Sequence, residues 1–220
     1  MSSEKQGMSR RAFLSKTAAV TAAGALVAGT RNSVQGQVIG ANDTINIAVM
    51  GIRSRGQGHI RNFAEMENVR VTWLCDVDEK LFPDRVQIAQ DLQGSKPKTA
   101  QDIREVLEDD DLDAVSMGTP NHWHALGTIW SAQAGKHVYV EKPASHNIWE
   151  GRKMVDAARK YNVLVQVGFQ NRSRNNTNAA MKFLHDGGLG EVYMARGLCF
   201  KPRGDIGRPQ NAPVPEGLDY

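Results

Sequence analysis

The sequence predicts an α/β protein: a doubly wound parallel sheet followed by the start of a second, incomplete α/β domain. From residue 44 onward, short apolar runs alternate with helical patterns in the rhythm of β-α-β units. The runs are continuously apolar and rich in β-branched residues, as expected for strands covered by helices on both faces. After residue 169 this rhythm changes, which indicates that a new domain begins there.

The first three strands are expected at residues 45–50, 69–75 and 98–100. The first is a β-branched apolar run that ends at Gly51, and a helix over residues 56–66 follows it. The second strand precedes a helix over residues 79–92, in which Pro83 lies near the first turn, where proline is tolerated. The third strand is short and precedes a helix over residues 101–108.

Three further strands complete the expected sheet, at residues 112–117, 137–141 and 163–169. The acidic turn Asp109-Asp110-Asp111 introduces the first of them, and the connecting helices are expected over residues 122–134 and 148–160. Beyond the sheet we expect a helix over 176–185, a strand over 191–200 and a tail rich in proline and glycine. Because nothing remains to close this second domain, the chain is expected to be part of a longer protein, with domains at residues 1–43, 44–168 and 169–220.

Residues 1–43 resemble a twin-arginine export signal with a linker. Arg10 and Arg11 lie in the segment Ser-Arg-Arg-Ala-Phe-Leu-Ser-Lys, and an apolar stretch rich in alanine and glycine follows. That stretch is shorter than the roughly 20 residues that a spanning helix needs. We therefore expect a periplasmic or otherwise exported protein, recognised by the twin-arginine export machinery and without a stable membrane anchor. An ordinary amphipathic helix is disfavoured, because no polar face repeats at helical spacing.

Charge and composition exclude several classes of function. The formal net charge is +3, but five of the 27 basic residues lie in the first 31 positions, so the remainder is close to neutral. A nucleic-acid-binding domain would keep a basic face on its folded part. Cys75 and Cys199 are too few for a disulfide framework or a four-cysteine zinc site, and we expect no bound metal.

Two motifs follow the first two strands. Gly51-Ile52-Arg53-Ser54-Arg55-Gly56 separates the first strand from its helix, where a dinucleotide fold needs a tight turn that approaches a pyrophosphate. Arg53 replaces the usual second glycine and could bind phosphate or stack on adenine. Asp76 ends the second strand, where a carboxylate binds adenosine ribose hydroxyls and favours NAD, although Arg53 and Arg55 could compensate the 2'-phosphate of NADP. Alternatively, Asp76 or Asp78 caps the next helix.

Two more motifs follow later strands, at the edge where doubly wound sheets bind ligands. Thr119-Pro120-Asn121-His122-Trp123-His124 follows the strand over 112–117. Its two histidines diverge by about 200° at a helix start, which disfavours a metal site. Glu141-Lys142-Pro143 follows the strand over 137–141, and the lysine could bind a substrate hydroxyl and help move its proton. A surface salt bridge is the alternative for this lysine.

Together, these four motifs resemble the Gfo/Idh/MocA oxidoreductases in order and spacing, from about residue 45 to the end of the chain. The resemblance implies a Rossmann domain that binds NAD or NADP, with NAD slightly favoured, and a second domain that forms the substrate wall. It implies Lys142 as the catalytic lysine and Arg172 as a residue that faces the substrate. The positions that it implies for cofactor binding are Gly51, Ile52, Arg53, Gly56, Asp76, Thr119, Pro120, Asn121, His124, Glu141 and Lys142.

The resemblance also implies what the chain lacks. Family members use a histidine, and often an aspartate, in the second domain as acid/base groups, and the sequence has no such motif before Tyr220. His185 lies in the wrong segment for this role. The full-length protein is expected to be a homo-oligomer.

Three functions remain open from the sequence. The leading hypothesis is hydride transfer between nicotinamide and a hydroxyl-bearing carbon of a sugar or polyol. The second is an NAD-dependent glycoside hydrolase that works by transient oxidation and elimination. The third is a cofactor-binding fragment without catalytic activity of its own. Both enzymatic readings need Lys142 and the dinucleotide site, so the residues do not separate them.

Overall fold

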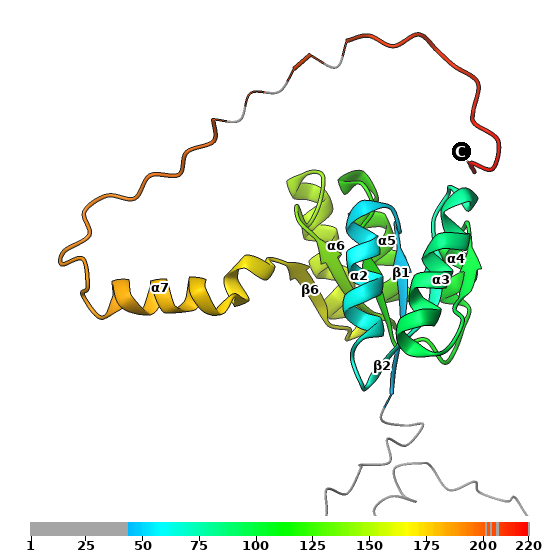
Figure 1. Ribbon diagram of the computed structural model, residues 1–220, viewed down its shortest axis with the longest axis horizontal. Coiled ribbons are helices and arrows are strands. Elements are labelled where there is room, and N and C mark those ends of the chain that lie inside the picture. The colour runs from blue at the N-terminus through cyan, green and yellow to red at the C-terminus, as the bar shows by residue number, and fades with distance from the viewer. Residues whose placement is uncertain (1–43, 201, 203, 206, 220) are drawn as a thin grey trace, which may run out of the picture. The chain divides into compact units, whose positions relative to one another are not determined.

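Six parallel strands form one sheet in the order β3-β2-β1-β4-β5-β6. Figure 1 shows the computed structural model, which describes residues 44–219 except 201, 203 and 206. The strands are β1 (Ile45–Met50), β2 (Val69–Cys75), β3 (Lys98–Ala100), β4 (Ala114–Met117), β5 (His137–Glu141) and β6 (Val165–Gly168). This confirms the predicted doubly wound α/β fold. The expected export signal, residues 1–43, lies outside the described residues.

Helices connect the strands as the sequence predicts. They are α2 (Ser54–Ala64), α3 (Phe82–Gln93), α4 (Ile103–Leu107), α5 (Asn121–Gln133) and α6 (Ile148–Tyr161). A short 3-10 helix, η1 (Glu79–Leu81), precedes α3, because Pro83 has no N–H to donate and occupies the start of the α-helix. None of the described helices is long and apolar enough to cross a membrane.

The helices cover the two faces of the sheet, because successive side chains of a strand point to opposite faces. On one face, Ile47 and Val49 of β1 pack with residues of α2 and α3. On the other, Ala48 and Met50 pack with residues of α4, α5 and α6. Both faces of β1 are thus buried, which explains its unbroken apolar sequence.

All the strands end at the same edge of the sheet, because they are parallel. The register pairs Met50 at the end of β1 with Cys75 of β2 and with Met117 of β4. Glu141 at the end of β5 pairs with Gly168 of β6. The motifs that follow β1, β2, β4 and β5 therefore gather along one edge.

The segment after β6 differs from the prediction. The 3-10 helix η2 (Gln170–Ser173) and the helix α7 (Asn175–His185) form, and α7 agrees with the expected helix over 176–185. Residues 191–200, expected as a strand, form no strand. A strand is held by hydrogen bonds to a neighbouring strand, and among the described residues none pairs with this segment.

Candidate cofactor-binding site

Three glycines meet where β1, α2 and β4 come together. Gly51 follows β1 with φ of 78°, a backbone conformation that favours glycine, and its N–H donates to Cys75 O at 2.8 Å. A Cβ atom on Gly56 would collide with the carbonyl oxygen of Gly51. A Cβ atom on Gly118 would lie 3.0 Å from the same oxygen. The turn after β1 can therefore approach the end of β4 only if these positions carry no side chain.

This turn leads into a helix whose N-terminus is open. Helix α2 begins at Ser54, no side chain caps it, and no acidic residue lies in its first turn. The first N–H groups of a helix have no partner within the helix and carry partial positive charge. The turn and the start of α2 can therefore bind an anion such as a pyrophosphate.

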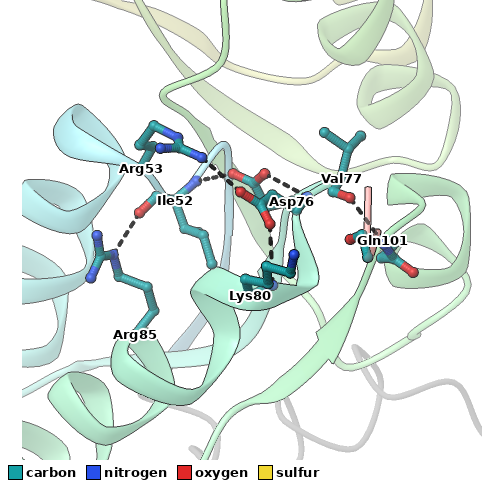
Figure 2. Close-up of polar contacts among 9 residues, drawn as sticks. Ile52, Arg53, Asp76, Val77, Lys80, Arg85 and Gln101 are labelled. Atoms are coloured by element: carbon teal, nitrogen blue, oxygen red, sulfur yellow. Dashed lines mark hydrogen bonds and ion pairs between the residues drawn. The ribbon is translucent and has the colours of Figure 1, made fainter. Parts of the chain in front are cut away.

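Asp76, directly after β2, is bound to the glycine turn. Its Oδ2 accepts the N–H of Ile52 at 2.8 Å, and its Oδ1 accepts the N–H of Asp78 at 3.0 Å (Figure 2). Each carboxylate oxygen has a second lone pair free to accept another hydrogen bond. The carboxylate is thus fixed in place and can still accept from the two hydroxyls of a ribose. The side chain of Ile52 is fully buried in the core, so only its backbone takes part.

The side chain of Arg53 lies against the loop after β2. Its Nη2 is 2.7 Å from Oδ2 of Asp78, and the two residues form an ion pair (Figure 2). Arg53 is largely exposed, whereas Asp78 is mostly covered and also accepts the N–H of Lys80 as the N-cap of η1. Of the two aspartates considered from the sequence, Asp78 therefore caps the helix and Asp76 binds the turn. The carbonyl of Ile52 accepts from Arg85 Nε at 2.8 Å, which further fixes the turn.

A cavity of about 520 Å³ lies beside these groups, at the carboxyl edge of the sheet. Gly51 and Asp76 line one part of it, and Thr119, Pro120 and Trp123 line another. Asp219 also lines it, because the segment before it returns to the loop after β2. There Asp219 N donates to Val77 O at 2.9 Å, and Gly217 O accepts from Glu79 N at 3.0 Å.

The segment after β4 provides a hydroxyl without a partner. Thr119 Oγ1 is buried and makes no hydrogen bond with the described residues. Because burying an unpaired hydroxyl is unfavourable, a bound ligand could supply its partner. Pro120 precedes α5 and Asn121 is its first, exposed residue.

His124 lies in this segment but not in the cavity. The ring is 1% exposed, with Nδ1 2.6 Å from Pro143 O and Nε2 3.0 Å from Thr119 O. His124, which was predicted to bind the cofactor, can therefore support the site only indirectly, by joining these two loops. His122, two residues earlier, is exposed and lines the cavity.

Lys142 follows β5 at the same edge of the sheet. Its side chain is exposed, and no acidic group among the described residues pairs with it. The peptide between Lys142 and Pro143 is cis. Its catalytic role remains a prediction, and the structure leaves its ammonium group accessible.

The side chain of Glu141 turns inward, away from the exposed ammonium of Lys142. It is 5% exposed, and its Oε1 accepts from Arg55 Nε at 2.7 Å and from His59 Nε2 at 3.1 Å. Ser116 Oγ lies 2.8 Å from the other ring nitrogen, Nδ1 of His59. Glu141 was predicted to bind the cofactor, but it does not line the cavity, and these contacts place it between α2 and the end of β5.

Burial and charge set the protonation of this cluster. Burial lowers the pKa of His59 below its ordinary value, although the hydrogen bond to Glu141 opposes this effect. Burial raises the pKa of Glu141, but the bonds from Arg55 and His59 outweigh it and hold the pKa below its ordinary value. At neutral pH the cluster therefore contains an ionised Glu141 and a neutral His59, which donates from Nε2 and accepts from Ser116 at Nδ1.

The remaining predicted site residue, Arg172, does not line the cavity, and His185 was not predicted to belong to the site. Arg172 is exposed in η2, and nothing in the structure tests its predicted contact with substrate. His185 is the last residue of α7. Within the part of the chain that the structure describes, no group of three or more histidine, cysteine, aspartate or glutamate side chains could hold a metal ion.

Sequence reasoning missed the residues that form the hydrogen-bonded cluster around Glu141. His59, Ser116 and Gln170 were not singled out, and Arg55 was considered only as a possible phosphate ligand. One signal was available for His59, because it lies on the face of α2 that also carries the buried Ile60 and Ala64. A histidine on a buried helix face needs polar partners, and that requirement points to Glu141 and Ser116.

The site fits a dinucleotide at three points. The open start of α2 suits a pyrophosphate, the fixed carboxylate of Asp76 suits a ribose, and the unpaired hydroxyl of Thr119 lies further along the same cavity. All three groups lie near β1 and β4. This is the point in the sheet from which successive strands are added first toward one edge and then toward the other. These features define a dinucleotide-binding α/β domain.

The family follows from a direct match. The model of the Gfo/Idh/MocA oxidoreductase family, described as having an NAD-binding Rossmann fold, matches residues 45–169, and the chain belongs to this family. A glycosyl hydrolase family 109 protein from Shewanella pealeana is 30% identical over 171 residues, which cover 70% of this chain. The aligned part covers 37% of that relative, so the chain spans well under half the length of the curated proteins that it matches.

Solved structures share the fold. An NAD-binding oxidoreductase from Klebsiella pneumoniae aligns with a TM-score of 0.56 and 28% identity, over 67% of this chain and 40% of that one. A scyllo-inositol dehydrogenase from Lactobacillus casei, solved with NAD(H) and scyllo-inositol, aligns with a TM-score of 0.58 and 24% identity, over 67% of this chain and 43% of that one. Both likenesses support the observed α/β architecture.

Proposed function

We propose that this chain is the cofactor-binding part of an NAD-preferring oxidoreductase that acts on a hydroxyl-bearing carbon of a sugar or polyol. The observation that carries the proposal is the carboxylate of Asp76. It is held against the glycine turn by two backbone N–H groups and still has lone pairs for a ribose diol. The family match supports NAD binding.

The charges around Asp76 support NAD over NADP. A 2'-phosphate would bring a charge of roughly −1.5 to −2 to this position. Asp76 and Asp78 already place two carboxylates there, and Arg53 neutralises one of them. Arg55, which the sequence left open as a phosphate ligand, is bound to Glu141 instead. A 2'-phosphate would therefore lie against the carboxylate of Asp76, which forms no ion pair with the described residues.

Lys142 lies where a side chain could move a proton. Its exposed ammonium at the carboxyl edge can donate to the oxygen of a substrate hydroxyl and, when neutral, accept the proton of that hydroxyl. The nicotinamide ring, when bound, supplies the acceptor for the hydride of the same carbon. The acid/base groups of the second domain, expected from the family resemblance, would complete the site in a longer chain.

A second candidate function is glycoside hydrolysis through transient oxidation. The names of the curated relatives, glycosyl hydrolase family 109, favour it. In this reaction, oxidation of a sugar hydroxyl acidifies the neighbouring C–H, and loss of that proton expels the glycosidic oxygen. Water then adds and the hydride returns to the sugar, so no net oxidation remains. The same Lys142 and the same cofactor site serve both reactions.

The cofactor assignment is tested by the binding of NADH and NADPH to the chain, followed by the fluorescence of Trp123 and Trp130, which line the cavity. NADH should bind more tightly than NADPH. Asp76→Asn should weaken the binding of NADH about tenfold or more, because hydrogen bonds to a charged group contribute about 1.5–3 kcal/mol. Asp156→Asn, which alters an exposed aspartate of α6, serves as the matched control. Equal binding to wild type and Asp76→Asn would refute the assignment.

The two reactions are separated by their products. An oxidoreductase accumulates NADH from a polyol, whereas the hydrolase releases nitrophenol from a nitrophenyl glycoside without net NADH. In heavy water the hydrolase also exchanges the acidified C–H of the sugar for deuterium. Lys142→Met should abolish whichever activity the protein shows. Unchanged turnover in this variant would remove Lys142 from the mechanism.

A further inference from the structure

Arg55 lies in the first turn of α2, yet its guanidinium group does not line the cavity. It reaches Oε1 of Glu141 from both Nε and Nη2, at 2.7 and 2.6 Å. With the amide of Gln170 oriented to satisfy both its neighbours, the oxygen of Gln170 also accepts from Arg55 Nη2 at 2.8 Å, while its nitrogen donates to Gly168 O. One side chain thus joins the glycine turn to the ends of β5 and β6.

The acceptor of this contact is rigid. Glu141 and His59 are 5% and 3% exposed, and the ring of His59 is held between Glu141 on one side and Ser116 of β4 on the other. Tyr139 packs edge to face against the same ring, with centroids 5.6 Å apart. Since hydrogen bonds link Glu141, His59 and Ser116 in series, displacing one member disturbs the others.

The far oxygen of Glu141 points to the next residue along the chain. Oε2 lies 3.4 Å from the backbone N–H of Lys142, so the carboxylate contacts Arg55 with one oxygen and Lys142 with the other. A displacement of Arg55 therefore reaches the backbone of Lys142 through a single side chain.

We propose that Arg55 is a positioning residue, which couples occupation of the glycine turn to the placement of Lys142 through the carboxylate of Glu141. This inference rests on the proposed function, because it assumes that a dinucleotide binds at the turn. An anion bound at the start of α2 contacts the turn that carries Arg55, and the hydrogen bonds of Glu141 link Arg55 to the backbone of Lys142. Binding of the cofactor at the turn is then felt at the backbone of Lys142.

The coupling is tested by nuclear magnetic resonance of the 15N-labelled chain titrated with ADP. ADP can occupy the glycine turn and Asp76 but has no nicotinamide to contact Lys142 directly. The amides of Ile52 and Asp78, which both bind Asp76, report binding. The amide of Lys142 reports the coupling. In wild type, ADP should shift all three resonances.

Arg55→Met should separate the two signals. The amides of Ile52 and Asp78 should still shift with ADP, while the shift of the Lys142 amide is lost. Arg61→Met is the matched control, since Arg61 is an exposed arginine of the same helix, and it should leave all three shifts intact. The double variant with Arg55→Met and Glu141→Gln has no uncompensated carboxylate and should also lose the Lys142 shift. It covers the case in which Arg55→Met alone is poorly folded.

The other outcomes are distinct. A Lys142 shift that persists in folded Arg55→Met would overturn the coupling and leave the proposed function intact. Loss of ADP binding in a folded Arg55→Met variant would make Arg55 a phosphate ligand rather than a positioning residue. If the amides of Ile52 and Asp78 do not move in wild type, the proposed function fails and the coupling fails with it.

Discussion

The imidazole of His124 contacts the carbonyl oxygen of Pro143 at 2.6 Å. The same ring contacts Thr119 O at 3.0 Å with its other nitrogen. A buried side chain of α5 therefore joins the loop after β4 to the loop that carries Lys142. The two loops lie at the ends of neighbouring strands, and His124 fixes the distance between them.

His124→Ala should destabilise the protein by about 2–4 kcal/mol, because it removes a buried ring together with its hydrogen bond to a loop carbonyl. His122→Ala, at the exposed histidine two residues earlier, should change stability by less than about 0.5 kcal/mol. Urea unfolding of the two variants measures the difference. Equal stability of the variants would contradict the structural role of His124.

The glycine turn predicts a second pair of variants. Gly56→Ala should prevent correct folding or destabilise severely, because its Cβ would collide with the backbone of Gly51. Gly58 lies two residues further along α2, and nothing lies within 4 Å of its Cβ position, so Gly58→Ala is the matched control. It should be neutral or stabilise by about 0.5–1 kcal/mol, since alanine is the better helix former. Circular dichroism and thermal melting compare them, and similar melting temperatures would contradict the close contact.

The free energy of unfolding should decrease in two steps as the pH is lowered. Burial lowers the pKa of His59 below its ordinary 6.5, so below about that pH the unfolded chain binds a proton that the folded protein resists. The pKa of Glu141 is raised by burial but lowered more by Arg55 and His59, so a further loss follows below its ordinary 4.5. Both effects make the unfolded state bind more protons, and the free energy of unfolding must decrease in acid.

Chemical denaturation between about pH 7 and about pH 5 tests the first step. His59→Gln removes the titrating ring and keeps a donor toward Glu141, so the slope of stability against pH should become flatter. His146→Gln, at an exposed histidine, should keep the wild-type slope. The same slope in all three proteins would contradict the assignment of the buried neutral ring.

The two cysteines should differ strongly in reactivity. Burial, with the charge of Asp76 nearby, raises the pKa of the Cys75 thiol to about 12, whereas Cys199 is exposed. Because the thiolate is the reactive form, iodoacetamide at about pH 8 should label the native protein once, at Cys199. Cys199→Ser should then remain unlabelled until it is unfolded. Labelling of native Cys75 at a comparable rate, measured by peptide mass spectrometry, would contradict its burial.

The contact of residues 217–219 with the loop after β2 gives a further prediction. Gly217 and Gly207 have φ of 80° and 68°, so alanine at either position carries similar backbone strain. Only at Gly217 would the Cβ meet a neighbour, the side chain of Glu79. Gly217→Ala should therefore disturb the contact of this segment with the loop after β2 and change the affinity for NADH, while Gly207→Ala should leave the affinity unchanged. Equal affinities would show that this segment does not contribute to the site.

The strands were predictable because their apolar runs end close to where the strands end. The strand over 137–141 has the predicted bounds, and so has the strand over 98–100. The start of β4 was placed two residues early, since Leu112 belongs to the preceding turn and its N–H donates to Asp109 O. The strand over 191–200 was wrong for a different reason, because an apolar segment becomes a strand only beside a partner.

The site was predictable only in part, for a geometric reason. Parallel strands bring their carboxyl ends together, so Gly51, Asp76 and Thr119 could be grouped at one edge from their positions alone. The direction of a side chain depends on partners far away in the sequence. Arg55 and Glu141 are 86 residues apart, and no local pattern connects them.

The meeting of Gly51, Gly56 and Gly118 also orders events during protein synthesis. β1, α2 and β2 leave the ribosome well before β4, and until β4 emerges the inner edge of β1 has no partner. At roughly 5–20 residues per second, that edge stays open for several seconds. The nascent chain therefore passes through a stage in which the β4 side of the nucleotide pocket is missing and the inner edge of β1 is unpaired. Pairing of β4 ends this exposure and completes the pocket in one step.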